Sequence, residues 1–484
     1  MTTSIWWVRR DLRLADNQAF AAAAAAAEQV LPVFVLDDRL LHSRYVGEKR
    51  IAFMLDGLRA LDADLHSRGS RLLVRRGDPS AVLTRLCQET GAAAVFAQRD
   101  YSPFAVARDA AVRDALPVPL HLAEGVTARP PESIHKEDGS PFVMHAPFAK
   151  RWRAFGPVVR SDLLPAPQQI RTPAQPEGEP IPSVLALPSS VPFVAGEAEG
   201  QRRLLAFVNG ENAPVFSYAK LRNQPALDAT SQLSPYLRWG MVSPRLAAVA
   251  AYEAFARAGE KNGAAAHDAH NGADTWLAEL IWREFSIALL HYFPHVRSGS
   301  FKPQLNNFPW RNDDADFRAW CEARTGYPIV DAAMRQLAAE GWLPNRCRLI
   351  TASFLVKDLL IDYRLGEQFF MQHLIDGDPA ANNGNWQWIA GSAADAAPPF
   401  RVFNPALQAE KFDPDGAYVR RWLPELQNVP VKFIHQPWLM SKSEQVKARC
   451  VLGQDYRLPI VDHSAARERA LAVYRSARSG PPPD

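Results

Sequence analysis

The chain has 484 residues, of which 47% are hydrophobic and 22% charged, a composition typical of a globular protein with a large buried core. Its net charge of +3 excludes a globally polycationic nucleic-acid binder but permits a local phosphate-binding surface. Four scattered cysteines with no Cys-x-x-Cys pair indicate neither a zinc site nor an iron–sulfur cluster. The first apolar run precedes its basic residues, and no apolar run has the length of a membrane span, so we expect a cytoplasmic protein.

Short β-rich runs alternate with helical stretches over residues 1–130. Such alternation predicts an α/β domain with a doubly wound parallel sheet, whose ligands bind beyond the carboxyl ends of the strands. No Gly-x-Gly-x-x-Gly or P-loop pattern occurs, so an ordinary dinucleotide site is not expected. The predicted strands are Ser4–Val8, Val30–Leu36, Arg71–Arg75, Ala93–Ala97 and Pro119–Leu122, and the predicted helices are Asn17–Glu28, Glu48–Ser67, Pro79–Glu89 and Ala105–Ala115.

The rest of the chain divides by composition. Residues 131–198 are predicted to be a long interdomain linker, because the stretch from Leu164 to Pro192 is rich in proline and has no periodicity. Residues 199–475 show helical patterns broken by glycine and proline, which predicts a large all-α domain. Residues 476–484 are expected to form a frayed tail.

Several motifs in this order resemble the photolyase/cryptochrome family, and the resemblance extends over nearly the whole chain. It is nearest to the class I cyclobutane pyrimidine dimer photolyases. It implies light-driven repair of UV-damaged DNA by fully reduced FAD, with an α/β antenna-binding domain and a helical domain that binds FAD and DNA. The motifs are Trp7–Leu14, Thr230–Gly240, Trp276–Phe285, Gly326–Arg335 and Asp376–Trp388.

Hydroxyl residues before a short helical run near Pro235 could form either a phosphate cradle or a plain N-cap. The resemblance assigns this segment to the FAD pyrophosphate. It also places an Asp376–Arg348 pair over the flavin and Asn382 opposite flavin N5, where a neutral amide accepts a hydrogen bond and favours reduced flavin. The cofactor-binding residues it implies are Tyr218, Thr230, Ser231, Gln232, Leu233, Ser234, Trp276, Arg283, Arg348, Asp376, Gly377, Asp378 and Asn382.

Glu279 and Trp282 share one broad helix face with Trp276 and Arg283. The resemblance implies that both meet the lesion, which must be flipped out of the duplex, as photolyases and other base-modifying enzymes do. Glu279 would hydrogen-bond the pyrimidine carbonyls and stabilise the radical anion of the dimer. Further implied DNA or lesion contacts are Arg222, Asn345, Arg346, Leu349, Trp388, Arg401 and Gln408.

The lesion class depends on Asn345 and Leu349, which stand where (6-4) photolyases have histidines for acid–base chemistry. Their identity favours the cyclobutane dimer, although Leu349 replaces a usual methionine and Pro344 a common histidine. Proline fits the first turn of a helix but not its interior. A (6-4) photolyase, a signalling cryptochrome and a single-strand-specific cryptochrome remain alternatives within the family. A flavodoxin-type electron-transfer protein would explain only the N-terminal half.

Family members photoreduce FAD through three tryptophans, and Trp386 and Trp310 match the inner and outer ones. The middle position is Tyr363, which is harder to oxidise unless its proton leaves at the same time, so photoreduction is expected to be slower or to use another aromatic residue such as Trp388.

A second chromophore is expected at the strand ends of the N-terminal domain. Phe104 and Ala105 stand where a folate antenna would need Asn and Glu. Phe34, Arg50 and Asp100 resemble an 8-hydroxy-deazaflavin-type pocket, which is therefore favoured over folate, while an empty pocket or a flavin antenna stays open. The large DNA-binding face favours a monomer.

Overall fold

The computed structural model describes residues 1–183, 185–260, 263–395 and 401–479. Its contacts divide the chain into two compact units. Unit 1 comprises Met1–Ala219, Thr230–Pro294 and Ile375–Ala381, and unit 2 comprises Lys220–Ala229, His295–Leu374 and Asn382–Asp484. The domain boundaries predicted from composition stay a prediction.

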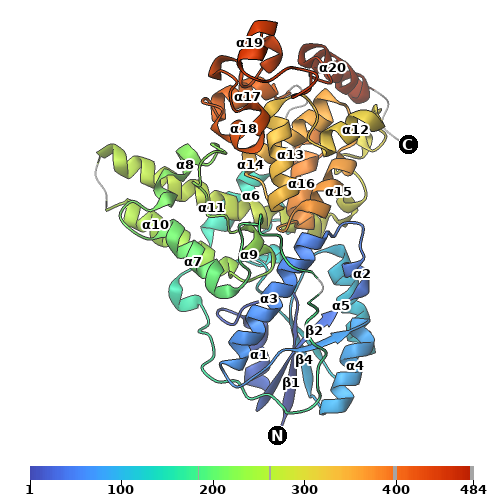
Figure 1. The fold of residues 1–484 in the computed structure, drawn as a ribbon. Coiled ribbons are helices and arrows are strands. Elements are labelled where there is room, and N and C mark those ends of the chain that lie inside the picture. The colour runs from blue at the N-terminus through green and yellow to red at the C-terminus, as the bar shows by residue number, and fades with distance from the viewer. Residues whose placement is uncertain (184, 261–262, 396–400, 480–484) are drawn as a thin grey trace. The chain divides into compact units, whose positions relative to one another are not determined.

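Unit 1 contains a five-stranded parallel sheet of order β3-β2-β1-β4-β5, which confirms the predicted α/β class. Right-handed crossovers place α1 and α3 on one face and α4 and α5 on the other (Figure 1). The strands are β1 (Thr3–Val8), β2 (Gln29–Leu36), β3 (Leu73–Arg76), β4 (Ala94–Gln98) and β5 (Leu120–Ala123). The first helices are α1 (Gln18–Ala26), α2 (Asp38–Leu41), α3 (Glu48–His66), α4 (Pro79–Thr90) and α5 (Pro103–Ala115).

The central strand β1 is buried along its whole length, as expected for a sheet covered on both faces. Trp7 packs into the core cluster on one face, and Trp6 contacts Phe20 of α1 edge-on at 5.2 Å on the other. The buried carboxylate of Asp11 accepts hydrogen bonds from Trp6 Nε1 at 3.0 Å and from the Arg9 backbone N–H at 2.7 Å. These bonds fix the chain as it leaves β1.

A group of helices completes unit 1. Gly272 of the long helix α11 packs so closely on the 3-10 turn η3 (Pro214–Ser217) that a Cβ there would lie 2.3 Å from the Val215 carbonyl oxygen. No helix in the described ranges is both long and apolar enough to cross a membrane. The helices are α6 (His145–Ala154), α7 (Glu197–Val208), α8 (Tyr218–Leu221, which continues into unit 2), α9 (Ser234–Arg238), α10 (Pro244–Ala258) and α11 (Gly263–Tyr292).

Unit 2 is helical around a core that includes Trp320, Phe354 and Trp386. The carboxylate of Asp331 accepts bonds from Thr325 Oγ1 and the Tyr456 hydroxyl, both at 2.7 Å, so the family motif around it is structural. Its helices are α12 (Asp314–Cys321), α13 (Pro328–Glu340), α14 (Asn345–Ser353), the π-helical η6 (Phe354–Asp358), α15 (Tyr363–His373), α16 (Pro379–Ala390, begun in unit 1), α17 (Pro405–Phe412), α18 (Ala417–Trp422), α19 (Lys442–Lys447) and α20 (His463–Ser479). Short 3-10 turns in the two units are η1 (Pro131–Ser133), η2 (Arg160–Asp162), η3 (Pro214–Ser217), η4 (Pro294–Arg297), η5 (Pro303–Leu305), η7 (Pro424–Leu426), η8 (Val431–Phe433) and η9 (Pro437–Leu439).

Gly240, two residues beyond α9, brings that loop against the segment that follows β1. Its φ is +65°, and a Cβ there would lie closer than any contact distance to the Arg10 carbonyl oxygen. We expect Gly240→Ala to destabilise unit 1 by about 3 kcal/mol, from left-handed strain plus backbone overpacking. The measurement is thermal unfolding followed by circular dichroism.

Gly91 is the matched control, because its φ is +63° but nothing lies within 4 Å of a Cβ built on it. Gly91→Ala should therefore cost only the conformational strain, about 1–2 kcal/mol. Equal losses of stability in the two variants would show that the close approach at Gly240 is unimportant.

Candidate functional site

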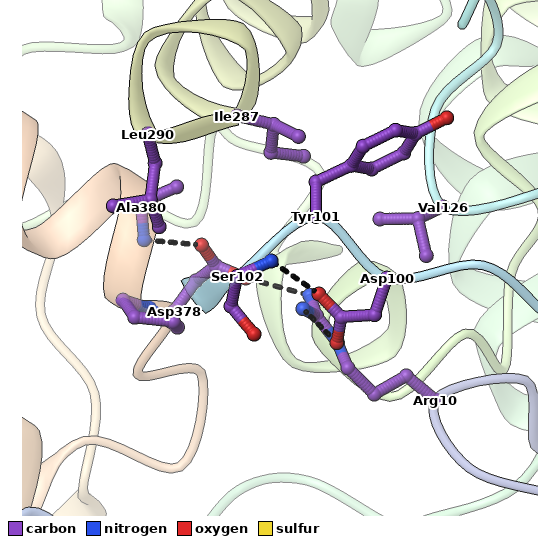
Figure 2. Close-up of a pocket in the computed structure, with 10 residues that line it drawn as sticks. Arg10, Asp100, Tyr101, Ser102, Val126, Ile287, Leu290, Asp378 and Ala380 are labelled. Carbon is purple, nitrogen blue, oxygen red and sulfur yellow. Dashed lines mark hydrogen bonds and ion pairs between the residues drawn. The ribbon is translucent and has the colours of Figure 1, made fainter. Parts of the chain in front are cut away.

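The strand order of the sheet reverses between β1 and β4, which is where ligands bind in doubly wound folds. Arg10 follows β1 and Asp100 follows β4. The Arg10 guanidinium binds Asp100 Oδ2 at 3.2 Å and Asp378 Oδ2 at 2.6 Å, as Figure 2 shows. These side chains are only 11–13% exposed. A residue at the strand end is thus joined to the turn that precedes α16.

Three more arginines of unit 1 surround the Asp376–Asp378 turn. Arg238 Nε donates to the Gly377 carbonyl at 2.8 Å, and its Nη1 lies 3.7 Å from Asp378. Arg50 packs on Gly377, where a Cβ would lie 2.2 Å from its Nη2. Arg283 donates to the Val126 carbonyl at 2.8 Å.

The charges in this group shift one another's titration. Burial would raise the pKa of Asp378, but Arg10, Arg238 and Arg283 lower it to about 2. Burial and the charge of Arg10 lower the pKa of Arg238 to about 9, against the attraction of Asp378. Burial lowers the pKa of Arg50 to about 10, although Asp376 and Asp378 oppose this shift. Four arginines therefore face three aspartates, counting Asp100, and the excess positive charge favours an anionic ligand group.

The pocket at this point has an apolar wall beside its charged floor. Tyr101, Val126, Ile287 and Leu290 line it together with Arg10, Asp100 and Asp378 (Figure 2). Of the residues that resemble an antenna pocket, Asp100 and Arg50 lie in this charged group, and Phe34 is buried in β2. The structure thus brings residues assigned to the antenna together with Asp378, which is assigned to FAD. Sequence reasoning missed Arg10 and Arg238, although both lie within the quoted motifs.

The segment predicted to hold the pyrophosphate makes a sharp turn into α9, which begins at Ser234, one residue before the expected Pro235. Gln232 has a φ of 48° and accepts a bond from Arg203 at 2.8 Å, and Leu233 is buried. Thr230 and Ser231 lie just before this turn. Tyr218 and Trp276 both contact Phe207, with ring centroids 5.8 and 5.2 Å from it, so the structure brings these two predicted residues together.

Glu279 and Trp282 lie half-buried on α11, one turn apart, as the helical spacing predicts. Ser286 Oγ donates to the Trp282 carbonyl at 2.9 Å. These two predicted lesion contacts belong to unit 1, whereas the other predicted DNA contacts belong to unit 2.

Asn382 of unit 2 is held by its amide nitrogen, which donates to the Glu367 carbonyl at 3.0 Å. Glu367 is in turn bound to Arg297 at 2.6 Å. This contact uses the amide nitrogen as a donor and leaves Oδ1 as the acceptor of the side chain. The role of Asn382 opposite flavin N5 stays a prediction. Arg348, in the same unit, donates from Nε to the Leu343 carbonyl at 3.0 Å.

The three aromatic residues of the predicted electron path lie in unit 2. Trp386 packs on the backbone of α15, where a Cβ at Gly366 would lie within 2.5 Å of its ring. Tyr363, one turn earlier on α15, contacts Trp310 with ring centroids 6.4 Å apart. Burial raises the pKa of the Tyr363 phenol, while hydrogen bonding with the Ser300 and Ser392 hydroxyls beside it acts in the opposite direction.

The predicted DNA contacts of unit 2 gather around Arg346. Its guanidinium binds Asn223 Oδ1 at 2.9 Å and approaches Gln408 Oε1 at 3.4 Å. Burial and the charges of Arg222 and Arg401 lower its pKa, so three arginines lie close together. Arg401 also stacks over Trp388 at 5.8 Å.

Helix α14 begins at Asn345 with Pro344 as its N-cap residue, at a φ of −56°. The proline thus precedes the helix and costs it no hydrogen bond. Asn345 is exposed, and the half-buried Leu349 packs against the core of unit 2.

Sequence models of two families match the chain. The family described as DNA photolyase matches residues 4–169, and the FAD binding domain of DNA photolyase matches residues 276–476. A deoxyribodipyrimidine photo-lyase from Agrobacterium fabrum is 39% identical over 492 residues, covering 98% of this chain and 98% of the relative.

Two solved structures share the fold over nearly the full length. A bacterial class III photolyase from Agrobacterium tumefaciens has a TM-score of 0.89 at 37% identity, covering 99% of this chain and 98% of that one. A cryptochrome from Synechocystis sp. has a TM-score of 0.86 at 29% identity, covering 98% of this chain and 99% of that one.

Asp378→Asn tests the charged group. The amide oxygen still accepts the bonds that Asp378 receives from the backbone N–H groups of Ala380 at 2.9 Å and Ala381 at 3.2 Å, while the negative charge and the bond that Oδ2 accepts from Arg10 are lost. Because the folded pKa of Asp378 is about 2 and its ordinary value is 3.8, its stabilisation is present above pH 4 and is lost as pH falls toward 2. The unfolding free energy of the wild type should exceed that of the variant above pH 4. This difference should decrease by about 2 kcal/mol as the pH falls from 4 to 2. Urea unfolding at pH 2 to 6 measures it, and a constant difference would contradict the ion pairing.

Proposed function

The chain belongs to the photolyase/cryptochrome family and is a light-driven DNA-repair enzyme with FAD as its cofactor, and we propose that its substrate is the cyclobutane pyrimidine dimer. The observation that carries the proposal is the arginine group beside Trp388 in unit 2. Arg222, Arg346 and Arg401 supply a concentrated positive charge on a chain whose net charge is only +3. Such a group suits phosphates that flank an unstacked base.

The proposed FAD contacts are those that the family resemblance implies. In unit 1 these are Tyr218, Trp276, Arg283, the segment 230–234 and the turn 376–378, and in unit 2 they are Arg348 and Asn382. When bound and fully reduced, FAD supplies on illumination the electron that opens the cyclobutane ring. The excess of buried arginines in unit 1 supports an anionic group there. Because the Asn382 amide nitrogen donates to the Glu367 carbonyl, its oxygen would be the atom that accepts a hydrogen bond from the protonated flavin nitrogen.

On the DNA side, the arginines would grip phosphates and so carry little sequence information, as a lesion-specific enzyme requires. In unit 1, Trp282 would offer the flipped dimer an apolar surface to pack on, and Trp388 is the aromatic lesion contact proposed for unit 2. Glu279 would donate or accept hydrogen bonds at the pyrimidine carbonyls and steady the charge that the dimer gains.

Asn345 and Leu349 favour the cyclobutane dimer over the (6-4) photoproduct as the lesion. A (6-4) photoproduct needs an acid–base group beside it, and neither an amide nor an alkyl side chain titrates in the required range. The same two residues leave an uncharged, partly apolar surface that suits a dimer. Within the photolyases that repair this lesion, we propose class I. One solved structure that shares the fold is a class III photolyase, 37% identical to this chain.

We place the second chromophore beyond β1 and β4, with Arg50, Asp100 and Phe34 as its residues. An 8-hydroxy-deazaflavin type is favoured over folate, because Phe104 and Ala105 stand where a folate antenna would need Asn and Glu. A monomer that works in the cytoplasm completes the proposal, since repair requires direct access to DNA.

The test is light-dependent repair of an oligonucleotide with one thymine dimer, beside a second that carries a (6-4) photoproduct. With reduced enzyme, we expect loss of the dimer in light only and no change in the (6-4) substrate. Chromatography of the products after illumination measures both. Repair of the (6-4) substrate alone would move the enzyme to the other lesion class, and repair of neither by reduced, FAD-loaded enzyme would favour signalling.

Tyr363 makes a separate prediction about how FAD becomes reduced. Oxidising a buried tyrosine requires its proton to leave, so photoreduction should be slow and slower still in D₂O. Tyr363→Trp should accelerate it at least about tenfold and remove the isotope effect, and Tyr363→Phe should slow it. Bleaching of oxidised flavin absorbance under blue light measures the rate.

Repair by chemically reduced enzyme serves as the control, because that reaction returns its electron to the cofactor and needs no aromatic path. All three proteins should then repair equally. Photoreduction that is unchanged in Tyr363→Phe but lost in Trp388→Phe would instead assign the path to Trp388.

A further inference from the structure

His145, the first residue of α6, lies flat against the indole of Trp282 on α11. The two ring centroids are 3.6 Å apart and the planes differ by 3°. Phe285 packs edge-on against both rings, at 5.7 Å from each. One face and one edge of the indole are therefore covered, and the exposed part of the half-buried Trp282 lies elsewhere on the ring.

Helix α6 is clamped to α11 by contacts that leave His145 little freedom. The buried carboxylate of Glu284 accepts a bond from Trp152 Nε1 at 2.6 Å and one from the Ala128 N–H at 2.5 Å. Phe148 packs on Phe285 at 5.3 Å. A charged pair at the far end of α6, Arg153 with Asp274 at 2.7 Å, adds a second attachment. The backbone of α6, from which His145 projects, is thus held beside α11 independently of Trp282.

We propose that His145 is a positioning residue for lesion binding, fixing the plane of Trp282 so that its uncovered face receives the flipped dimer. This inference rests on the proposed function, in which Trp282 offers the flipped dimer an apolar surface. The side chain of Trp282 has two rotatable bonds. If it were mobile in the free enzyme, ordering it on lesion binding would cost conformational entropy and weaken the affinity for damaged DNA. A ring already stacked on its rear face removes that cost before binding.

To hold the plane of Trp282, the side chain at position 145 needs a flat aromatic ring, and it does not need an ionisable proton. The flat face of the imidazole covers the indole face through van der Waals contact, which depends on the shape of the ring. Phenylalanine keeps a flat ring of similar reach. Alanine leaves the rear face of the indole open, so Trp282 gains alternative rotamers.

The experiment measures binding of an oligonucleotide with one thymine dimer and of the same duplex without damage, by fluorescence anisotropy with FAD-loaded enzyme. We expect His145→Ala to raise the Kd for damaged DNA about three- to tenfold, the usual worth of an aromatic pair, and to leave undamaged DNA unchanged. The quantum yield of repair at saturating DNA should stay at the wild-type value. His145→Phe should restore the Kd.

His121 offers the matched control, since it stacks on Phe96 in the sheet at 4.9 Å, and His121→Ala should leave the Kd unchanged. The proposal is overturned if His145→Ala binds damaged DNA like wild type. It is also overturned if that variant loses affinity for both duplexes together with thermal stability, or if His145→Phe fails to restore binding. If the wild-type enzyme binds the damaged and undamaged duplexes equally and does not repair the dimer, the proposed function itself is wrong.

Discussion

Arg10 joins two parts of the chain that are 368 positions apart, through its ion pair with Asp378, and the organisation of unit 1 depends on that pair. Arg10 lies just beyond the carboxyl end of the central strand β1, where the strand order reverses and doubly wound sheets bind their ligands. Its second carboxylate, Asp100, comes from the neighbouring strand. All three groups are nearly buried, so loss of either carboxylate would leave Arg10 with a single carboxylate partner in a medium that solvates charge poorly. The Asp376–Asp378 turn is therefore fixed relative to the sheet by electrostatics as well as by packing.

The same charges determine what this part of unit 1 could bind. Arg50, Arg238 and Arg283 each supply a positive charge to a turn that offers only two carboxylates. Burial lowers the pKa of Arg50 and of Arg238, and for Arg238 the neighbouring charges of Arg10 and Arg50 add to that shift. An anionic ligand would offset the excess of positive charge. The arrangement also explains why a glycine stands between Asp376 and Asp378, since any side chain there would collide with Arg50.

The sequence predicted the sheet well, because strands such as β1 and β2 are continuous apolar runs between turn residues and their ends moved by only one or two residues. Spacing on one helix also placed Glu279 and Trp282 together. The ion pairs of Arg10 could not be predicted this way, since no periodicity links a strand end to a turn so far along the chain. Arg238 was missed for the same reason. Pro344 could be interpreted from a local rule, since proline is tolerated at the start of a helix but not in its interior. The structure agrees, because Pro344 is the N-cap residue of α14.

The stretch predicted as a linker is where composition was least informative. Its second half is rich in proline, but residues 145–154 form α6, whose aromatic and charged side chains bind α11. Burial raises the pKa of Glu284, while the hydrogen bonds that Trp152 and two backbone N–H groups donate to its carboxylate act in the opposite direction. Removing those donors would leave either a protonated acid or a buried charge, and in both cases the clamp between α6 and α11 would weaken. A segment that connects domains in sequence thus supports, through His145, the helix that carries Trp282.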